Sequence, residues 1–467
     1  MSKRIAQLIF LLLVMLVLLS PLPLGSNREW SWSLLALLSG GLGIAWVAVA
    51  LFRPAEINTR LHFVILVLFV LSMGWALFQL TTWPPAAWHH PLWSMAGDVL
   101  GESLPGRISL APDAGWTASM RLLSYALVFL LAFQFGRQER YARAVFGWLT
   151  LGGLAYAVFG LITHWGGYQP NWLFGDLVLH RDVRSTFINR NHFATWQGLT
   201  VLCAVGYFYQ RMARPDVKPY AVPGSREDRV EEFVLRAWKP MTALLLMVTA
   251  LVLTHSRGGF VAALAGIAAF LWLLHRRTSS RSDRRKNLNR GIAGTAVIVA
   301  SIAFFLTSEV LLDRINRTDI TTEERMAVFA NINGAIGDNP SLGFGYGTFA
   351  DSFRLYDQNE AAVHYDRAHN TWLENAFELG VPAALLLYAS IAGLALTCWR
   401  GVQRRHCDWV YPAAGVGASV LVGVHALVDF SLQIPAVALL YALVMGIACA
   451  QSYSSVGQSG AVVRGRQ

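Results

Sequence analysis

The sequence has few charged residues and very little cysteine. Charged side chains make up 14% of the 467 residues, whereas a soluble chain normally carries about 25%. The four cysteines give no metal-binding spacing and no external disulfide, because they fall in apolar runs or in segments expected to be cytoplasmic: Cys203, Cys398, Cys407 and Cys449. This composition excludes a soluble enzyme, a disordered chain and a nucleic-acid-binding protein.

Long apolar runs dominate the sequence instead. Hydrophobic residues make up 55% of the chain, and its mean hydropathy is +0.43. Twelve runs approach the ~20 residues that cross a bilayer, at about 5–24, 33–52, 61–80, 119–136, 144–163, 193–210, 240–254, 259–275, 291–311, 376–399, 411–430 and 434–452. They predict an all-α polytopic membrane protein, a transmembrane helical bundle of about 12 spans in contact with the lipid bilayer.

The distribution of charge predicts the topology. With a cytoplasmic N-terminus, 26 of the 38 Lys and Arg residues but only 9 of the 28 acidic residues lie in cytoplasmic segments. By the positive-inside rule both termini are therefore cytoplasmic. The net charge of +10 is then a topology signal rather than a sign of an acidic partner. The first run is either a cleaved signal peptide or an uncleaved anchor, and the missing A-x-A-like site favours the anchor.

The predicted spans and loops divide the chain into three parts. Residues 1–184 hold N-terminal spans with one external loop at 81–118. Residues 185–400 form a core with a large external loop at 312–375, between the ninth and tenth spans. Residues 401–467 hold the last spans and a cytoplasmic tail. Long external loops in a compact helical protein usually cover a site or bind a partner.

Two arginines lie where placing a charge in the bilayer costs free energy, which suggests that they have a function. Arg190 lies at the outer mouth of the sixth span, and Arg257 lies between two spans with almost no loop. An arginine at such depth costs a few kcal/mol unless it has a partner or a wet cavity. Arg257 is therefore either an anchor that extends to the interface or an anion clamp whose fork matches phosphate oxygens. Gly258 and Gly259 are expected to let the backbone approach that anion.

A second cluster lies where the long loop enters the tenth span. Arg367 can hold an anion there, and neutral His369 can accept a proton near pH 7. Asn370 or Thr371 is expected to cap the helix. The alternative is a plain helix start whose histidine is a surface residue.

The remaining candidate features are one loop and one pair of ionisable residues. The loop 340–349, P-S-L-G-F-G-Y-G-T-F, lacks the Lys and spacing of a phosphate-binding loop, so it is interpreted as a turn with aromatic plugs. His425 and Asp429 are four residues apart on one face of the eleventh span, where ionisable groups are functional candidates. They are expected to pair with each other or with Arg257. No metal-ligand cluster is visible, so neither a metal nor a cofactor is expected.

Three segments in order resemble the O-antigen ligase and polymerase superfamily of bacterial envelope glycosyltransferases. Residues 186–194, T-F-I-N-R-N-H-F-A, are similar to the family motif T-F-x-N-x-N-H-x-A. Residues 254–259, T-H-S-R-G-G, are similar to its T-x-S-R-G turn. The block from Arg325 to Gly380 resembles its R…P-x-x-G-x-G…H-N-x-x-L…E-x-G pattern. The resemblance covers about residues 185–400.

This resemblance implies a reaction and a site. Family members move a glycan from undecaprenyl diphosphate to an acceptor hydroxyl at the periplasmic face of the inner membrane, without nucleotide sugar or metal. The acceptor is lipid A-core, another carrier-linked glycan or a protein. His369 matches the catalytic base and Arg257 the diphosphate-binding residue, with Arg190 and Arg367 as further diphosphate candidates. Five supporting residues complete the predicted site: Asn189, His192, Asn370, His425 and Asp429.

Other functions remain open at this point. A polytopic transporter of a small anion and a protein O-oligosaccharyltransferase are the alternatives. Transporters often show repeats and broken helices at the midplane, whereas the ionisable residues here lie at the outer ends of spans. That placement favours chemistry at the outer face.

Overall fold

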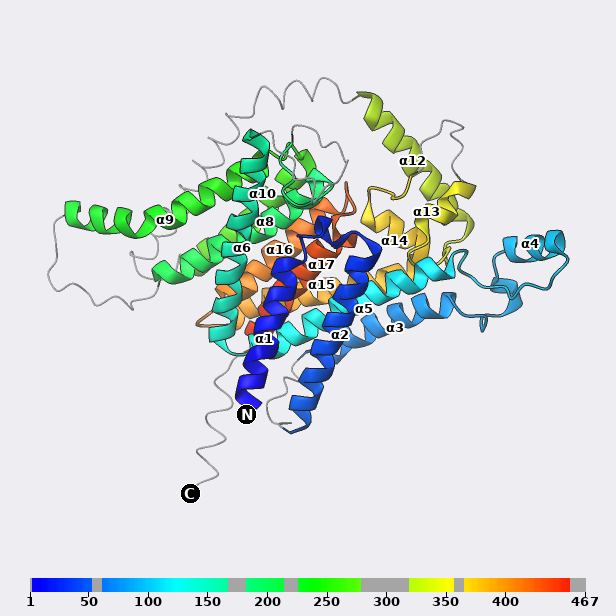
Figure 1. Ribbon diagram of the computed structural model, residues 1–467, viewed down its shortest axis with the longest axis horizontal. Helices are drawn as coiled ribbons and strands as arrows, with labels where there is room; N and C mark the ends of the chain where they lie inside the picture. Colours follow the sequence, from blue (N-terminus) through cyan, green and yellow to red (C-terminus); the bar gives the residue numbers. More distant parts are fainter. Residues whose placement is uncertain are drawn as a thin grey trace.

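A computed structural model gives the architecture of residues 2–52, 61–166, 182–213, 226–278, 319–356 and 365–453 (Figure 1). Within these ranges the chain is helical and contains no strand, which confirms the predicted all-α class. The helices are α1 (Ser2–Leu19), α2 (Glu29–Leu51), α3 (Phe63–Gln79), α4 (Leu92–Leu100), α5 (Pro112–Gly136), α6 (Glu139–Trp165), α8 (Arg190–Ala213), α9 (Arg226–Val252), α10 (Arg257–Thr278), α12 (Asp319–Asp338), α13 (Phe349–Ser352), α14 (Thr371–Leu379), α15 (Val381–Arg404), α16 (Val410–His425) and α17 (Pro435–Gln451).

Several of these helices have the length and apolar character of membrane spans. In the described part of the chain, α2, α5, α6, α10 and α15 are each long and apolar enough to cross a bilayer. Shorter apolar helices include α1, α3, α16 and α17. The predicted ninth span, 291–311, lies outside the described residues, so the count of twelve spans stays a prediction.

Helix α17 lies at the centre of the bundle (Figure 1). Every residue from Pro435 to Gln451 is buried, and the helix packs along α5. The two backbones come very close, because a Cβ on Gly446 would lie 2.5 Å from the carbonyl oxygen of Phe129. Small residues at such crossings permit the tight helix packing that stabilises membrane bundles.

Helices α8, α10 and α16 form the part of the bundle that carries the site. Gly266 of α10 and Gly417 of α16 face each other, and a Cβ on Gly417 would lie 2.8 Å from the Gly266 carbonyl oxygen. Gly198 of α8 approaches Ala263 of α10 in the same way, with 3.1 Å from its Cβ position to that methyl group. These crossings fix the ends of the three helices relative to one another. We call the end of the bundle at which α8 and α10 begin the site end.

The predicted tenth span, 376–399, is interrupted near its start. The chain breaks at Gly380, whose φ of +76° separates α14 from α15. The loop 340–347 satisfies the exposed carbonyls of α14, since the Phe344 and Gly345 amides donate to the carbonyls of Phe377 and Glu378. The helix α15, which is long and apolar enough to cross a membrane, therefore begins at Val381, and α14 precedes it.

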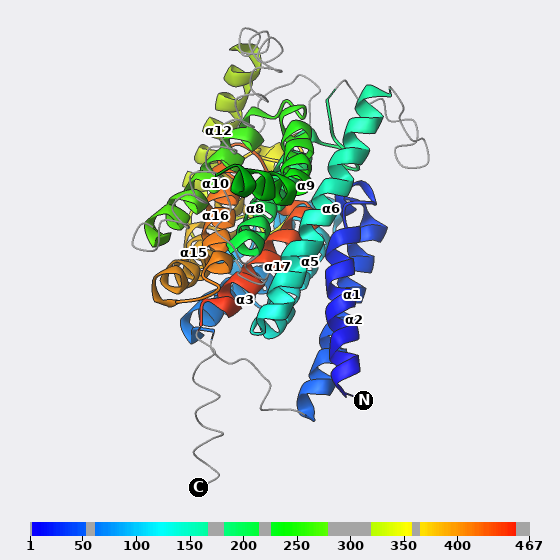
Figure 2. The same cartoon turned by 90° about the vertical axis from the view of Figure 1, so that its left-hand side faces the viewer.

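A helical layer with its own aromatic core covers the site end. Phe344 stacks on Phe377 with ring centroids 4.5 Å apart, and Phe349 stacks on Phe353 at 4.9 Å. All four rings are buried, which confirms that loop 340–349 is a turn with aromatic plugs. Figure 2 shows α12 of this layer at the top of the molecule, opposite the N-terminal end of α1. The described part of the large loop is therefore folded, and it forms a cover over the site end.

Candidate functional site

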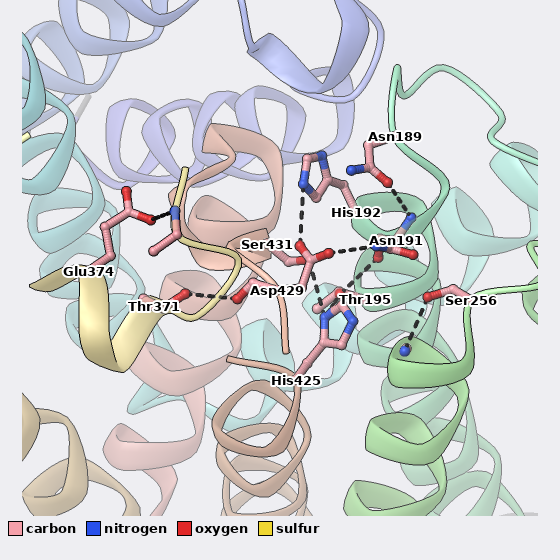
Figure 3. A network of polar contacts seen from close by, with 12 residues as sticks. Asn189, Asn191, His192, Thr195, Ser256, Thr371, Glu374, His425, Asp429 and Ser431 are labelled. Carbon is pink, nitrogen blue, oxygen red and sulfur yellow. Dashed lines mark hydrogen bonds and ion pairs between the residues drawn. The ribbon is translucent and has the colours of Figure 1, made fainter. Parts of the chain in front are cut away.

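The four segments that carry the predicted site residues meet at the site end. The Val183 amide donates to the carbonyl of Leu253, which joins the segment before α8 to the end of α9. The Thr371 amide donates to the carbonyl of Ala426, which joins the start of α14 to the end of α16. Residues far apart in the sequence thereby contribute to one polar network (Figure 3).

Asp429 is the centre of this network and is almost fully buried. Its carboxylate accepts hydrogen bonds from the side-chain Nδ2 of Asn191 at 2.6 Å and the Ser431 hydroxyl at 3.0 Å (Figure 3). The His192 Nε2 atom lies 3.5 Å from the same carboxylate. Helix α16 ends at His425, so the prediction that His425 and Asp429 share one helical face is wrong. Asp429 lies in the turn after the helix, and Ser431 connects the two residues.

The environment of Asp429 favours its ionised form. Burial alone would raise the pKa of this carboxyl. The contact with His192 opposes that effect, and His425 and Asn191 act in the same direction, so the net shift lowers the pKa of Asp429 below its ordinary value. A buried carboxylate that remains charged can orient the imidazole and amide groups around it.

His425 is held between two hydroxyl groups. Its Nδ1 atom lies 2.6 Å from the Thr195 hydroxyl and 3.1 Å from the Ser431 hydroxyl. Gly258 packs directly on the ring, because a Cβ at Gly258 would lie 3.3 Å from the imidazole. Gly259 likewise packs on Ala194, with only 2.5 Å from its Cβ position to that methyl group. The two glycines therefore serve close helix packing, rather than the approach of an anion that the sequence suggested.

His369 is held at the entrance to α14 by its backbone and by an aromatic contact. It adopts a left-handed conformation with φ of +51°, which is uncommon for a residue with a side chain. Asn370 caps α14 by accepting hydrogen bonds from the amides of Trp372 and Leu373. Phe430 lies between two histidines, with ring centroids 5.0 Å from His369 and 4.8 Å from His192. The predicted base thus shares an aromatic neighbour with the Asp429 network.

Arg367 is bound within the cover and faces two buried carboxyls. Its guanidinium lies 3.1 Å from Glu374, which has no exposed surface and also accepts a hydrogen bond from the Ala368 amide. Burial, together with the negative charge of Glu374, raises the pKa of Glu378 to about 8. Glu378 is therefore mostly protonated near pH 7, and the charge of Arg367 is balanced by the Glu374 carboxylate.

Arg190 belongs to a cluster around Asp182. Its guanidinium forms an ion pair with the Asp182 carboxylate, and that of Arg184 lies 3.8 Å away. The His255 Nδ1 atom lies 2.8 Å from the other oxygen of the same carboxylate. One buried acidic side chain therefore faces three basic ones.

The helix starts explain how the sequence presents Arg190 and Arg257. Asn189 precedes α8, and its side-chain oxygen accepts a hydrogen bond from the Asn191 amide at 2.8 Å. Ser256 precedes α10, and its hydroxyl accepts from the Gly259 amide at 3.2 Å. Arg190 and Arg257 are thus the first residues of capped helices at the same end of the bundle, and both are half-buried. Helix N-termini carry partial positive charge, so both arginines add to sites that attract anions.

The structure adds participants that the motifs did not single out. One addition is the contact between the side chains of Asp182 and His255. The others are the hydroxyl groups of Thr195 and Ser431 beside His425, and the ring of Phe430 beside His369. In the sequence, Asp182 was marked only by its nearness to Arg184 and Arg190. In the ranges that the structure describes, no group of three or more His, Cys, Asp or Glu side chains is placed to hold a metal ion.

Residues 242–388 match the family model of the O-antigen ligases. The matched segment is about a third of the chain and contains Arg257, Arg367 and His369, whereas Arg190 precedes it. The match confirms the resemblance that the motifs indicated. Together with the apolar helices it supports a multi-pass membrane glycosyltransferase of the O-antigen ligase and polymerase type. No curated protein matches the sequence.

Proposed function

We propose that this protein transfers a glycan from an undecaprenyl diphosphate carrier to an acceptor hydroxyl at the periplasmic face of the bacterial inner membrane. The acceptor is lipid A-core for a ligase, or a second carrier-linked glycan for a polymerase. The observation that carries the proposal is the position of His369 and Arg257. Both lie in the segment that matches the O-antigen ligases, and their helices both contact the end of α16.

The reaction needs a base for the acceptor and positive charge for the leaving group. The acceptor oxygen attacks the anomeric carbon, and His369 takes the acceptor proton. The bond between that carbon and the phosphate oxygen breaks, and its electron pair stays on the diphosphate. Arg257 binds the diphosphate oxygens through its planar fork and stabilises the charge that grows on them.

The surroundings of the other two arginines differ in net charge. Arg190 shares one carboxylate with Arg184 and His255, so its neighbourhood is basic. Arg367 faces the carboxyls of Glu374 and Glu378. Arg190 is therefore the second diphosphate-binding residue in this proposal, and Arg367 fixes the loop that presents His369.

The test is transfer by purified protein in liposomes that contain an undecaprenyl diphosphate-linked oligosaccharide and an acceptor. His369→Ala should lower kcat by about 10²–10⁴-fold, the usual effect of losing a general base, and should leave donor binding near that of the wild type. His62, the residue before α3, provides the matched control, and His62→Ala should retain activity. Activity should also persist in EDTA, since we propose no metal in the reaction.

The physiological acceptor is identified by separating lipid A-linked, polymeric and protein-linked glycan from a deletion strain. Accumulation of carrier-linked glycan supports the proposal. Normal glycans together with lost uptake of a small anion would contradict it and would favour a transporter. Wild-type transfer by His369→Ala would reject the base assignment.

A further inference from the structure

The cluster around Asp182 contains a histidine that the proposed mechanism has not used. His255 lies between Thr254, which is completely buried, and Ser256, which caps α10. Its backbone φ is +51°. A residue with a side chain is strained in this conformation, and such strained residues are found mostly at functional sites. Its side chain is 10% exposed and that of Asp182 is 3% exposed. The pair is thus nearly enclosed but retains a small opening.

The orientation of the imidazole follows from its partner. Nδ1 lies 2.8 Å from an Asp182 carboxylate oxygen, so this nitrogen carries the proton and donates it to that oxygen. Among the described residues, the structure shows no hydrogen bond to the opposite nitrogen, Nε2. Asp182 therefore fixes the orientation of the ring through Nδ1. When the imidazole also carries a hydrogen on Nε2, that hydrogen is the one left to donate to a ligand.

We infer that His255 is a further donor to the anionic leaving group, and that it hydrogen-bonds through Nε2 to a diphosphate oxygen while Asp182 holds its Nδ1. This inference rests on the proposed glycosyl transfer. Two positions support it. His255 and Arg257 lie on either side of Ser256, the capping residue of α10, and Arg190 contacts the same Asp182 carboxylate as His255. The donor set for the diphosphate then comprises Arg190, His255 and Arg257.

The contribution of His255 to the reaction is electrostatic. When the bond from the anomeric carbon to the phosphate oxygen breaks, the departing diphosphate gains one unit of negative charge. The Nε2–H group donates to that oxygen, and the acceptor proton goes separately to His369. A donor that is already oriented stabilises developing charge without reorganisation during the reaction.

A purely structural role for His255 is the competing explanation. In that case its function is to connect the segment before α8 with the turn before α10 through Nδ1 and Asp182. The charged and titratable groups around it are the same in both explanations: Asp182, Arg184, Arg190, Arg257 and His164. The two explanations differ only in which imidazole nitrogen matters.

Two substitutions separate the nitrogens. In His255→Asn the amide nitrogen occupies the position of Nδ1 and can still donate to Asp182, while the Nε2 donor is lost. In His255→Gln the amide nitrogen reaches the position of Nε2, while the bond to Asp182 is lost. Asparagine also adopts positive φ more readily than other residues with side chains, so His255→Asn should fold as well as the wild type.

The measurements are transfer from an undecaprenyl diphosphate-linked oligosaccharide in liposomes and thermal stability in detergent. We expect His255→Asn to lose about 10²–10³-fold in kcat, the usual effect of removing one donor to developing charge, at an unchanged Tm. His255→Gln should retain activity within about tenfold of the wild type, with a lower Tm.

The outcomes distinguish this inference from the proposed function. Wild-type turnover by His255→Asn, with loss confined to His255→Gln, would overturn the donor role and establish the structural one. If the wild-type protein itself transfers no glycan from the carrier, the proposed function fails, and this inference fails with it. Transfer by the wild type with full activity in both variants would reject only the role of His255.

Discussion

Substitutions of Arg257 test whether the site recognises a diphosphate through the geometry of the guanidinium or through charge alone. It begins α10 and is half-buried, and Gly258 beside it packs on His425. A lysine would keep the charge but offers a single point donor in place of a planar fork. We therefore expect Arg257→Lys to lose nearly as much glycan transfer as Arg257→Ala, measured at matched abundance in the membrane.

Arg143 provides the control for that comparison. It lies on α6 in an exposed pair with Glu139 at 3.9 Å, and such pairs contribute little. Arg143→Lys should therefore transfer glycan at the wild-type rate. An active Arg257→Lys variant would show that Arg257 only extends to the interface, because lysine does so equally well.

Glu378 should make the stability of the folded protein depend on pH, and its environment sets the direction of that dependence. Burial and the charge of Glu374 raise its pKa from 4.5 to about 8 in the folded protein. Between these two values the folded state holds a proton that the unfolded state has lost, so stability falls as the pH rises through this window. We expect the Tm in detergent to decrease from pH 5 to pH 8.5, and Glu378→Gln to show a weaker decrease. Parallel curves for the two proteins would contradict this prediction.

The sequence singled out individual candidate residues where a motif contains them. His369 and Arg257 lie in short motifs whose order along the chain matches a family. Asp182 and His255 are 73 residues apart and belong to no shared motif, so only the fold brings them together. Phe430 could not be found from its own sequence context, since its role depends on two histidines from other segments.

At the scale of helices, the crossing of α10 and α16 makes a testable contribution to stability. A Cβ on Gly417 would lie 2.8 Å from the Gly266 carbonyl oxygen, whereas a Cβ on Gly423 of the same helix meets open space. Gly417→Ala should therefore destabilise the protein by about 1–3 kcal/mol through overpacking. The readout is the midpoint of thermal unfolding in detergent.

Gly423→Ala is the matched control, because it adds the same methyl group to the same helix without a steric conflict. It should be neutral or slightly stabilising, since alanine has the higher helix propensity. Equal loss of stability in both variants would show that the crossing of α10 and α16 is not the cause.

Hydropathy predicted most helices because each crossing of a bilayer needs a long apolar run. It missed the break at Gly380, because the high average hydropathy of residues 376–399 outweighs Glu378, Gly380 and Pro382 within that run. The break is created by hydrogen bonds from the loop around Phe344 and Gly345. Such contacts between distant segments leave no local periodic signal.

At the scale of the whole molecule, the predicted topology places the cover over the site end in the periplasm. Ser341 lies in this cover and is exposed. In a Cys407→Ser background, Ser341→Cys should react with a membrane-impermeant thiol reagent in cells whose outer membrane has been permeabilised. Labelling that requires lysis of the inner membrane would reverse the orientation and remove the site from the periplasm.

The chain contains its own control for that experiment. Cys407 is exposed and lies between α15 and α16, in a segment predicted to be cytoplasmic. Cys203, Cys398 and Cys449 are buried and should not react. The unmodified protein should therefore be labelled only by a membrane-permeant reagent, and labelling from outside would contradict the same topology.

Gln79 has a consequence for the order in which the protein is assembled during synthesis. Its side chain is completely buried, donates to the carbonyls of Leu342 and Glu378, and accepts from the amide of Tyr346. All three partners emerge from the ribosome more than 250 residues later. Until then the amide at the end of α3 cannot be enclosed, because an unsatisfied polar group in hydrocarbon costs several kcal/mol. The N-terminal helices therefore enter the bilayer early but reach their final packing only after α14 has been made.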